Sequence, residues 1–357
     1  MFIVSPKWIY LNNKKFEEDK SLLIDGSIIK DILDTKAVDK FGKKINKIEY
    51  PNHVLMPTFV ESYIDMDDCY NQSDIDRKIN ILLKNGVTKI QAASNDYRKL
   101  ISYDINSSIN MSYVITLNGK DCNQRTINDV INILDFYKTD TSKRFSLNLE
   151  NILDYEENII KKLASISNEI NININIQGNI LSKITDKNKI NETVKFWDSI
   201  NLLNNCYLHD FFYENQNWLS LMNKKSIKLM INYNSIYSLE RLKYFLSLIE
   251  KKYVCILISH KSNLYNLYSF SKLTEILNIK NSDTFENQIF DCVTTNTSNI
   301  FYEASDSGHI KKGMLASFNI FDYSVNNFFI KDDSHKLSNL DNQSLTNVWS
   351  AGKQIIF

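Results

Sequence analysis

The stretch PTFVESYIDMDD, residues 57–68, joins an apolar β-strand to a row of polar side chains. In a β-strand, alternate residues share one face. The alternation therefore predicts one face formed by Glu61, Tyr63, Asp65 and Asp67. It predicts the opposite face to be formed by Val60, Ser62, Ile64 and Met66. A polar row of this kind indicates a metal site, a ligand site, or the remnant of one.

Strand-like runs recur along the chain after this stretch. They fall at 87–93, 109–117, 145–149, 170–177, 205–210, 226–233 and 252–259. Amphipathic segments of helical length lie between them at 73–86, 126–139, 155–169 and 238–251, and we expect Ser73 and Ser238 to cap the first and last of these. Eight strands alternating with helices predict an α/β fold, the (β/α)8 TIM barrel.

The two ends of the chain depart from this alternation. Residues 1–55 and 308–357 have the pattern of short strands joined by turns. Neither segment is long enough to bury a core of its own. We therefore expect residues 1–55 plus 308–357 to form one small β-sandwich-like domain beside a barrel of residues 56–307.

The run INININIQ, residues 170–177, contains an apolar row and an amide row. On a barrel strand the outer face packs against helices, so Ile172, Ile174 and Ile176 are expected to point outward. The inward face is then formed by Asn173, Asn175 and Gln177. These amides either line a site at the C-terminal end of the barrel or fill a wet interior, and both interpretations stay open.

The charge and cysteine content restrict the class of function. Lys plus Arg and Asp plus Glu are both 42, so no net field attracts nucleic acid or a membrane surface. The 5 cysteines are widely spaced, which argues against disulfides and structural zinc. With no apolar run of membrane-spanning length, we expect a cytoplasmic protein. The expected partner is a small-molecule ligand or another protein, and a homo-oligomer is left open.

The order of these features resembles the amidohydrolase superfamily, with MPTFVESYIDMD most similar to its cytosine deaminase branch. The tail carries the more specific likeness, in the turn formed by Gly308, Ile310 and Gly313 and in the strand ASFNIFD, where Ser317 replaces an Asp. The resemblance implies a metal centre at the barrel mouth.

The resemblance also implies where the metal ligands would fall. The paired histidines of the first strand correspond to Tyr63 and Asp65, the fifth-strand histidine to Gln177, and the sixth-strand histidine to His209. The catalytic Glu of the deaminase branch corresponds to Ile180. The eighth-strand Asp corresponds to Ser259, His260 or Lys261, depending on register. A phenol and an amide are poor ligands for zinc or iron near neutral pH.

Two hypotheses follow. The first is a barrel that has lost its metal centre and works without a cofactor as a ligand-binding or partner-binding pseudoenzyme. Its site would be formed by Glu61, Tyr63, Asp65, Gln177, His209, Ser259 and His260. The alternative is a divergent hydrolase or deaminase that acts on C–N bonds of a cyclic amide or nucleobase-like substrate. It would use a reduced or relocated zinc or iron site, with Asp65, His209 and His260 as candidate ligands.

No residue is assigned a catalytic role. Glu61, Asp67 and Asp68 are carboxylates with no evident partner nucleophile. A plain Asp–His hydrogen bond between Asp65 and His209 in a polar site is the simpler interpretation of that pair.

Overall fold

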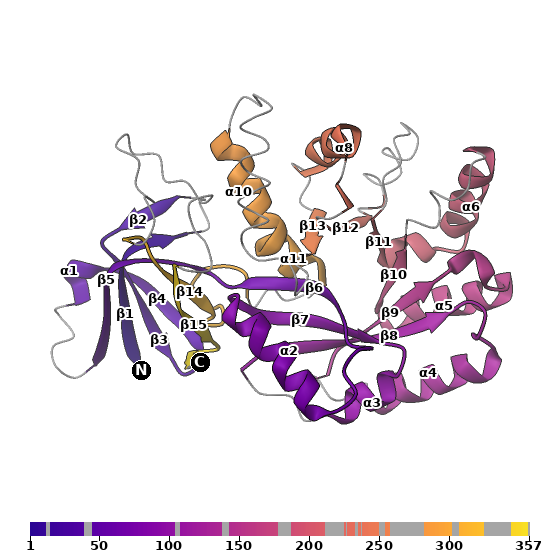
Figure 1. The fold of residues 1–357 in the computed structure, drawn as a ribbon, viewed down its shortest axis with the longest axis horizontal. Helices are drawn as coiled ribbons and strands as arrows, with labels where there is room; N and C mark the ends of the chain where they lie inside the picture. Colours follow the sequence, from indigo (N-terminus) through magenta and orange to yellow (C-terminus); the bar gives the residue numbers. More distant parts are fainter. Residues whose placement is uncertain are drawn as a thin grey trace.

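The computed structural model contains two β-sheets and the helices that surround one of them (Figure 1). It describes residues 1–11, 15–38, 45–103, 108–137, 143–177, 187–210, 225, 227–232, 235–236, 238–249, 254–257, 282–301, 307–324 and 344–355. Helices and strands carry the labels of Figure 1. No helix in these ranges is both long enough and apolar enough to cross a membrane.

The first sheet is the barrel. Its strands are β6 (Phe59–Asp65), β7 (Val87–Ser94), β8 (Asn110–Asn118), β9 (Phe145–Glu150), β10 (Asn173–Gln177), β11 (Cys206–His209), β12 (Lys228–Asn232) and β13 (Val254–Leu257). Each pairs in parallel with the next, and β13 contacts β6 where the barrel closes. The predicted (β/α)8 barrel is confirmed.

Helices connect the barrel strands. They are α2 (Gln72–Lys84), α3 (Tyr97–Ser102), α4 (Gln124–Tyr137), α5 (Glu157–Ile170), α6 (Lys187–Ser199), α8 (Leu239–Ile249), α10 (Ser282–Val293) and α11 (Thr295–Phe301), with 3-10 turns η2 (Ile152–Asp154) and η4 (Leu202–Asn205). Ser238 caps α8 as predicted, since its hydroxyl accepts from the Arg241 N–H. The predicted cap at Ser73 is wrong: α2 begins at Gln72, and its cap is Asn71, whose side chain accepts from the Asp74 N–H.

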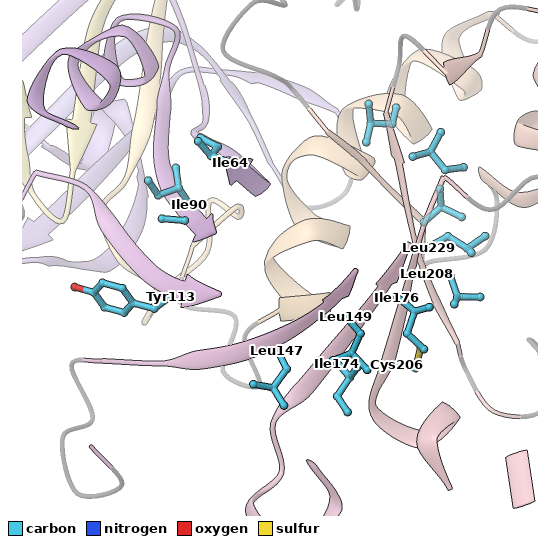
Figure 2. Close-up of a cluster of buried hydrophobic side chains, with 14 of the residues drawn as sticks. Ile64, Ile90, Tyr113, Leu147, Leu149, Ile174, Ile176, Cys206, Leu208 and Leu229 are labelled. Carbon is cyan, nitrogen blue, oxygen red and sulfur yellow. The ribbon is translucent and has the colours of Figure 1, made fainter. Parts of the chain in front are cut away.

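The main hydrophobic core lies between the outer face of the barrel and the helices (Figure 2). Alternate residues of each strand enter it, because successive side chains point to opposite faces. On β10 these are Ile174 and Ile176, both fully buried, which confirms the outward orientation predicted for these two residues. Leu208 on β11 and Leu229 on β12 extend the same layer. The remaining parity of each strand faces the barrel interior.

The first barrel strand breaks the simple alternation. The pairing of β6 with β7 shifts register between Phe59 and Val60, and again between Glu61 and Ile64. As a result, Val60 and Tyr63 both pack in a cluster inside the barrel with Tyr207, Met230 and Cys255. Strict alternation places Val60 and Tyr63 on opposite faces. The prediction that Val60 and Tyr63 point to opposite faces is therefore wrong. A β-bulge adds a residue and reverses the parity that follows it.

The second sheet is built from both ends of the chain. Its strands are β1 (Phe2–Tyr10), β2 (Phe16–Glu18), β3 (Lys20–Asp25), β4 (Ile28–Asp34), β5 (Asn46–Pro57), β14 (Phe318–Asp322), β15 (Leu345–Ser350) and β16 (Lys353–Ile355), with helix α1 at Thr35–Val38. The order is β16-β15-β14-β5-β1-β3-β4, with β2 on β1. The sheet curls around its own core, and the Ile29 N–H donates to the Met314 carbonyl at 2.8 Å.

The terminal sheet and the barrel are in direct contact. Asn319 on β14 donates from Nδ2 to the carbonyl of Gly86, just before β7, at 3.1 Å. Tyr10 on β1 donates to Asn287 on α10 at 2.7 Å, and its ring packs edge-on against Phe290. Thr58 alone separates β5 from β6 along the chain. The domain boundaries at residues 55/56 and 307/308 stay a prediction.

Candidate functional site

Three of the predicted site residues converge where barrel strands end. Gln177 and His209 are the last residues of β10 and β11, and they are direct partners in the pairing of these strands. The ring of Tyr63 on β6 lies 5.6 Å from the ring of His209, tilted by 49°. The C-terminal ends of barrel strands are where barrel folds place their sites. We refer to this end of the barrel as the mouth.

His209 is held in its neutral form at the mouth. Its side chain is 16% exposed, and its Nε2 lies 3.6 Å from Oδ2 of Asp210. Burial lowers the pKa of His209, while the charge of Asp210 opposes the shift. Asp210 is itself fixed, because it accepts from the Asn232 N–H at 2.7 Å and from the Ser235 hydroxyl at 2.9 Å. The imidazole is therefore available as a hydrogen-bonding group without a charge.

Tyr63 is a protonated phenol in this arrangement. Asn148 on β9 donates from Nδ2 to its hydroxyl oxygen at 3.4 Å. Burial raises the pKa of Tyr63, and the nearby charges of Asp65 and Glu150 raise it further. A phenolate is disfavoured by each of these causes. Tyr63 can therefore donate or accept a hydrogen bond, but it is a poor anionic ligand.

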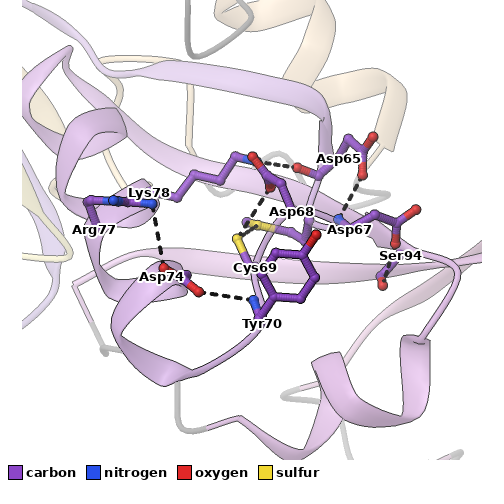
Figure 3. Close-up of polar contacts among 10 residues, drawn as sticks. Asp65, Asp67, Asp68, Cys69, Tyr70, Asp74, Arg77, Lys78 and Ser94 are labelled. Carbon is purple, nitrogen blue, oxygen red and sulfur yellow. Dashed lines mark hydrogen bonds and ion pairs between the residues drawn. The ribbon is translucent and has the colours of Figure 1, made fainter.

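Asp65 is turned toward the loop that follows β6 (Figure 3). Its side chain is exposed, and Oδ1 accepts from the N–H of Asp67 at 2.8 Å. Its backbone carbonyl accepts from the buried Nζ of Lys78 at 2.6 Å, and Lys78 also pairs with Asp68. Asp67 accepts from the Ser94 hydroxyl at 2.8 Å. The three carboxylates thus hold the loop in place, and Asp65 and His209 make no hydrogen bond in the described structure.

The remaining predicted residues lie elsewhere. Glu61 is fully buried, and its charge acts on the Cys255 thiol on β13. Burial is the main cause that raises the pKa of Cys255 to about 12, with Glu61 adding to it, so this thiol is not an activated nucleophile. The predicted positions Ile180, Ser259, His260 and Lys261 lie outside the described residues.

Glu150 is a mouth residue that sequence reasoning missed. It ends β9 and is half-buried, and burial, with the charges of Asp67 and Asp65, raises its pKa. These carboxylates give the mouth a negative potential on the side of β6 and β9. The signal was present in the sequence, because Glu150 directly follows the predicted strand 145–149 at the end where barrel sites lie.

Tyr63, Gln177 and His209 do not form the set of donors that a catalytic metal requires. Such a centre takes about three donors from imidazole, carboxylate or thiolate, with an open position for water. Here Tyr63 is protonated and Gln177 carries no charge, which leaves His209 as the one conventional donor among these three. Within the described part of the chain, no group of three or more His, Cys, Asp or Glu could hold a metal ion. The described residues therefore do not fit the metal centre that the resemblance implies.

The barrel with its terminal sheet is an architecture shared with known deaminases and hydrolases. No protein-family model matches the chain, and no curated protein matches it. Guanine deaminase from C. acetobutylicum with bound guanine is similar, with a TM-score of 0.77 and 13% identity over 99% of this chain and 100% of that one. Helicobacter pylori aminofutalosine deaminase is similar with a TM-score of 0.73 and 12% identity, over 100% of both chains. Atrazine chlorohydrolase TrzN from Arthrobacter aurescens, complexed with zinc, is similar with a TM-score of 0.75 and 10% identity. The match covers 100% of this chain and 95% of that one.

These likenesses cover both sheets and establish the fold. It is the fold seen in guanine deaminase, aminofutalosine deaminase and triazine hydrolase. The comparisons do not confirm the narrower likeness to the cytosine deaminase branch. At 10–13% identity, fold does not by itself carry function, which must be argued from the site.

Proposed function

We propose that this protein binds a small, polar, planar molecule at the barrel mouth and works as a pseudoenzyme of the deaminase and hydrolase fold. The observation that carries the proposal is the convergence of Tyr63, Gln177 and His209 at strand ends as neutral hydrogen-bonding groups. Each stands at a position where the resemblance implies a metal ligand. The site keeps its place in the fold and has a different donor chemistry.

The side chains at the mouth favour a particular ligand chemistry. Tyr63 offers an aromatic face together with a hydroxyl, and Gln177 offers both an acceptor and a donor. Asp65 and Glu150 lie close enough to raise the pKa of Tyr63. Their negative potential disfavours an anion and favours a neutral or cationic molecule. A neutral heterocycle with amide or amino groups matches these properties.

A second candidate function is a C–N hydrolase or deaminase that uses a reduced or relocated zinc or iron site. The comparisons favour this candidate over the first, because the similar structures are deaminases and hydrolases. Two of them, an adenosine deaminase and atrazine chlorohydrolase, contain zinc. His209 would be one ligand, and the others would have to come from residues such as His260, outside the described ranges.

Metal analysis separates the two candidates. The full-length protein, purified without chelator, is analysed for bound zinc, iron and manganese and is then tested for binding of heterocycles before and after EDTA treatment. We expect well under one metal ion per chain, and binding that survives EDTA. His209→Ala should weaken binding, whereas His53→Ala, a control on β5 in the terminal sheet, should not.

Stoichiometric metal would support the second candidate and contradict the first. So would release of ammonia, or opening of a ring, that depends on His209. In that case the heterocycles that bind would be converted, and EDTA would abolish the conversion.

A further inference from the structure

Asn175 is a buried amide with an unusual environment. It lies in the middle of β10 on the inward face, and its side chain is fully buried. Neither its Oδ1 nor its Nδ2 has a hydrogen-bond partner among the described residues. A primary amide can make several hydrogen bonds, and the large majority of buried polar side-chain atoms make at least one. An amide kept in this state calls for a partner that the described residues do not supply.

The neighbouring strands do not supply that partner. In the strand pairing, Asn175 lies beside Asn148 on β9 and Tyr207 on β11. Asn148 donates from its amide nitrogen to the Tyr63 hydroxyl oxygen at 3.4 Å. The Tyr207 hydroxyl accepts from Nζ of Lys228 at 3.2 Å. Both inward neighbours are thus engaged with other groups, and neither makes a hydrogen bond to the Asn175 amide.

The position of Asn175 relates it to the mouth. Gln177 lies two residues further along β10 on the same face and is half-buried at the strand end. Two residues of a strand span about 6.6 Å. A group that enters past Gln177 and His209 would therefore meet Asn175 next. The interior beside it is apolar where Val60, Met230 and Cys255 cluster.

We propose that Asn175 is a specificity-determining residue that recognises an amide-type edge of the ligand, meaning an N–H donor next to a carbonyl or ring-nitrogen acceptor. This proposal rests on the proposed function, since it requires a ligand at the mouth. One planar edge would satisfy the Asn175 acceptor and donor together, as Asn does in its paired contacts with a base edge. A ring whose nitrogen is methylated loses the donor and would leave Oδ1 unsatisfied.

The experiment uses matched ring pairs on the full-length chain. Uracil is compared with 1,3-dimethyluracil, and 2-pyridone and δ-valerolactam are each compared with their N-methyl forms, by ligand-observed NMR titration, so that no methylated ring keeps an N–H. The variants are Asn175→Leu, which removes the amide at similar size, and Asn173→Leu, the same change on the same face of the same strand but farther from the mouth.

We expect wild-type protein to bind at least one ring about tenfold more tightly than its N-methyl form, the order expected for one buried hydrogen bond. Asn175→Leu should reduce that ratio to near one without lowering the melting temperature, because it removes two unsatisfied polar atoms. Asn173→Leu should keep the ratio. A structural role alone would instead show as a lower melting temperature and an unchanged ratio.

The inference and the proposed function fail in different ways. If wild-type protein binds the rings and Asn175→Leu leaves the ratio unchanged, the role of Asn175 is overturned and ligand binding stands. The same holds if a crystal structure with a bound ring shows Asn175 hydrogen-bonded only to an ordered water. If wild-type protein binds none of the rings, the proposed function itself is overturned.

Discussion

The ring of Tyr63 on β6 packs 5.6 Å from the ring of His209 on β11, joining the first and sixth strands of the barrel. Tyr63→Ala should destabilise the protein by about 2–4 kcal/mol, because a partly buried aromatic side chain leaves a gap between these strands. Tyr63→Phe keeps the ring and removes the contacts of the hydroxyl with Asn148 and Thr116, so it should cost about 0.5–1.5 kcal/mol. Urea denaturation of the three proteins measures the difference. Equal losses would contradict the packing role of the ring.

His209 should make stability depend on pH. Burial holds its pKa below the unfolded value of 6.5, so the unfolded chain binds the proton more readily. The stability that neutral His209 preserves is present above about pH 6.5 and is lost as the pH falls below it, by up to about 1.4 kcal/mol per pH unit. His209→Gln should give a shallower slope between pH 7.5 and 5. An unchanged slope would show that other groups carry the dependence, among them His53 and His309, whose pKa values burial also lowers.

Glu150 should have the opposite effect. Burial and the neighbouring Asp67 and Asp65 raise its pKa above the unfolded value of 4.5, so its charge opposes folding above that pH. Glu150→Gln should stabilise the protein at pH 7 by less than about 1 kcal/mol, because the carboxyl is partly exposed and screened. The gain should vanish near pH 3.5. Glu192→Gln, an exposed residue on α6, is the control and should change stability less.

Gly86 should tolerate no side chain. Its φ is +77°, and a Cβ atom there would overlap the amide of Asn319, which donates to its carbonyl. Gly86→Ala should therefore cost about 2–4 kcal/mol, from the left-handed backbone and the overlap together. Gly26 provides a matched control, since its φ is +59° and a Cβ there would meet nothing within 4 Å. Gly26→Ala should cost about 1–2 kcal/mol. Equal losses in thermal or urea unfolding would contradict the contribution of the overlap.

The fold was predictable because its signals are repeated. Each barrel strand buries an apolar row such as Ile174 and Ile176, and the same alternation recurs along the chain with helical segments between. One misjudged strand does not alter such a pattern. The closing of both ends into one sheet was predictable for a related reason, since neither end could bury a core alone.

The candidate site was less predictable because it depends on single residues. The register shifts in β6 place Val60 and Tyr63 on the same side, and a parity argument cannot see a bulge that no Gly or Pro marks. The capping of α2 by Asn71 was missed for a similar reason, since Asn71 and Ser73 are both good caps by type. The orientation of Asp65 toward its own loop depends on Asp67 and Lys78, whose positions only the folded chain fixes.

The pairing of β5 with β14 has a consequence for synthesis on the ribosome. Roughly 260 residues separate Pro57 at the end of β5 from Phe318 at the start of β14. At typical translation rates of about 5–20 residues per second, the edge of β5 that β14 covers stays open in the nascent chain for roughly 13–50 s. An open strand edge can pair with another chain. The barrel thus emerges while its neighbouring sheet is incomplete, and crowded nascent chains could pair through this open edge of β5 until β14 is made.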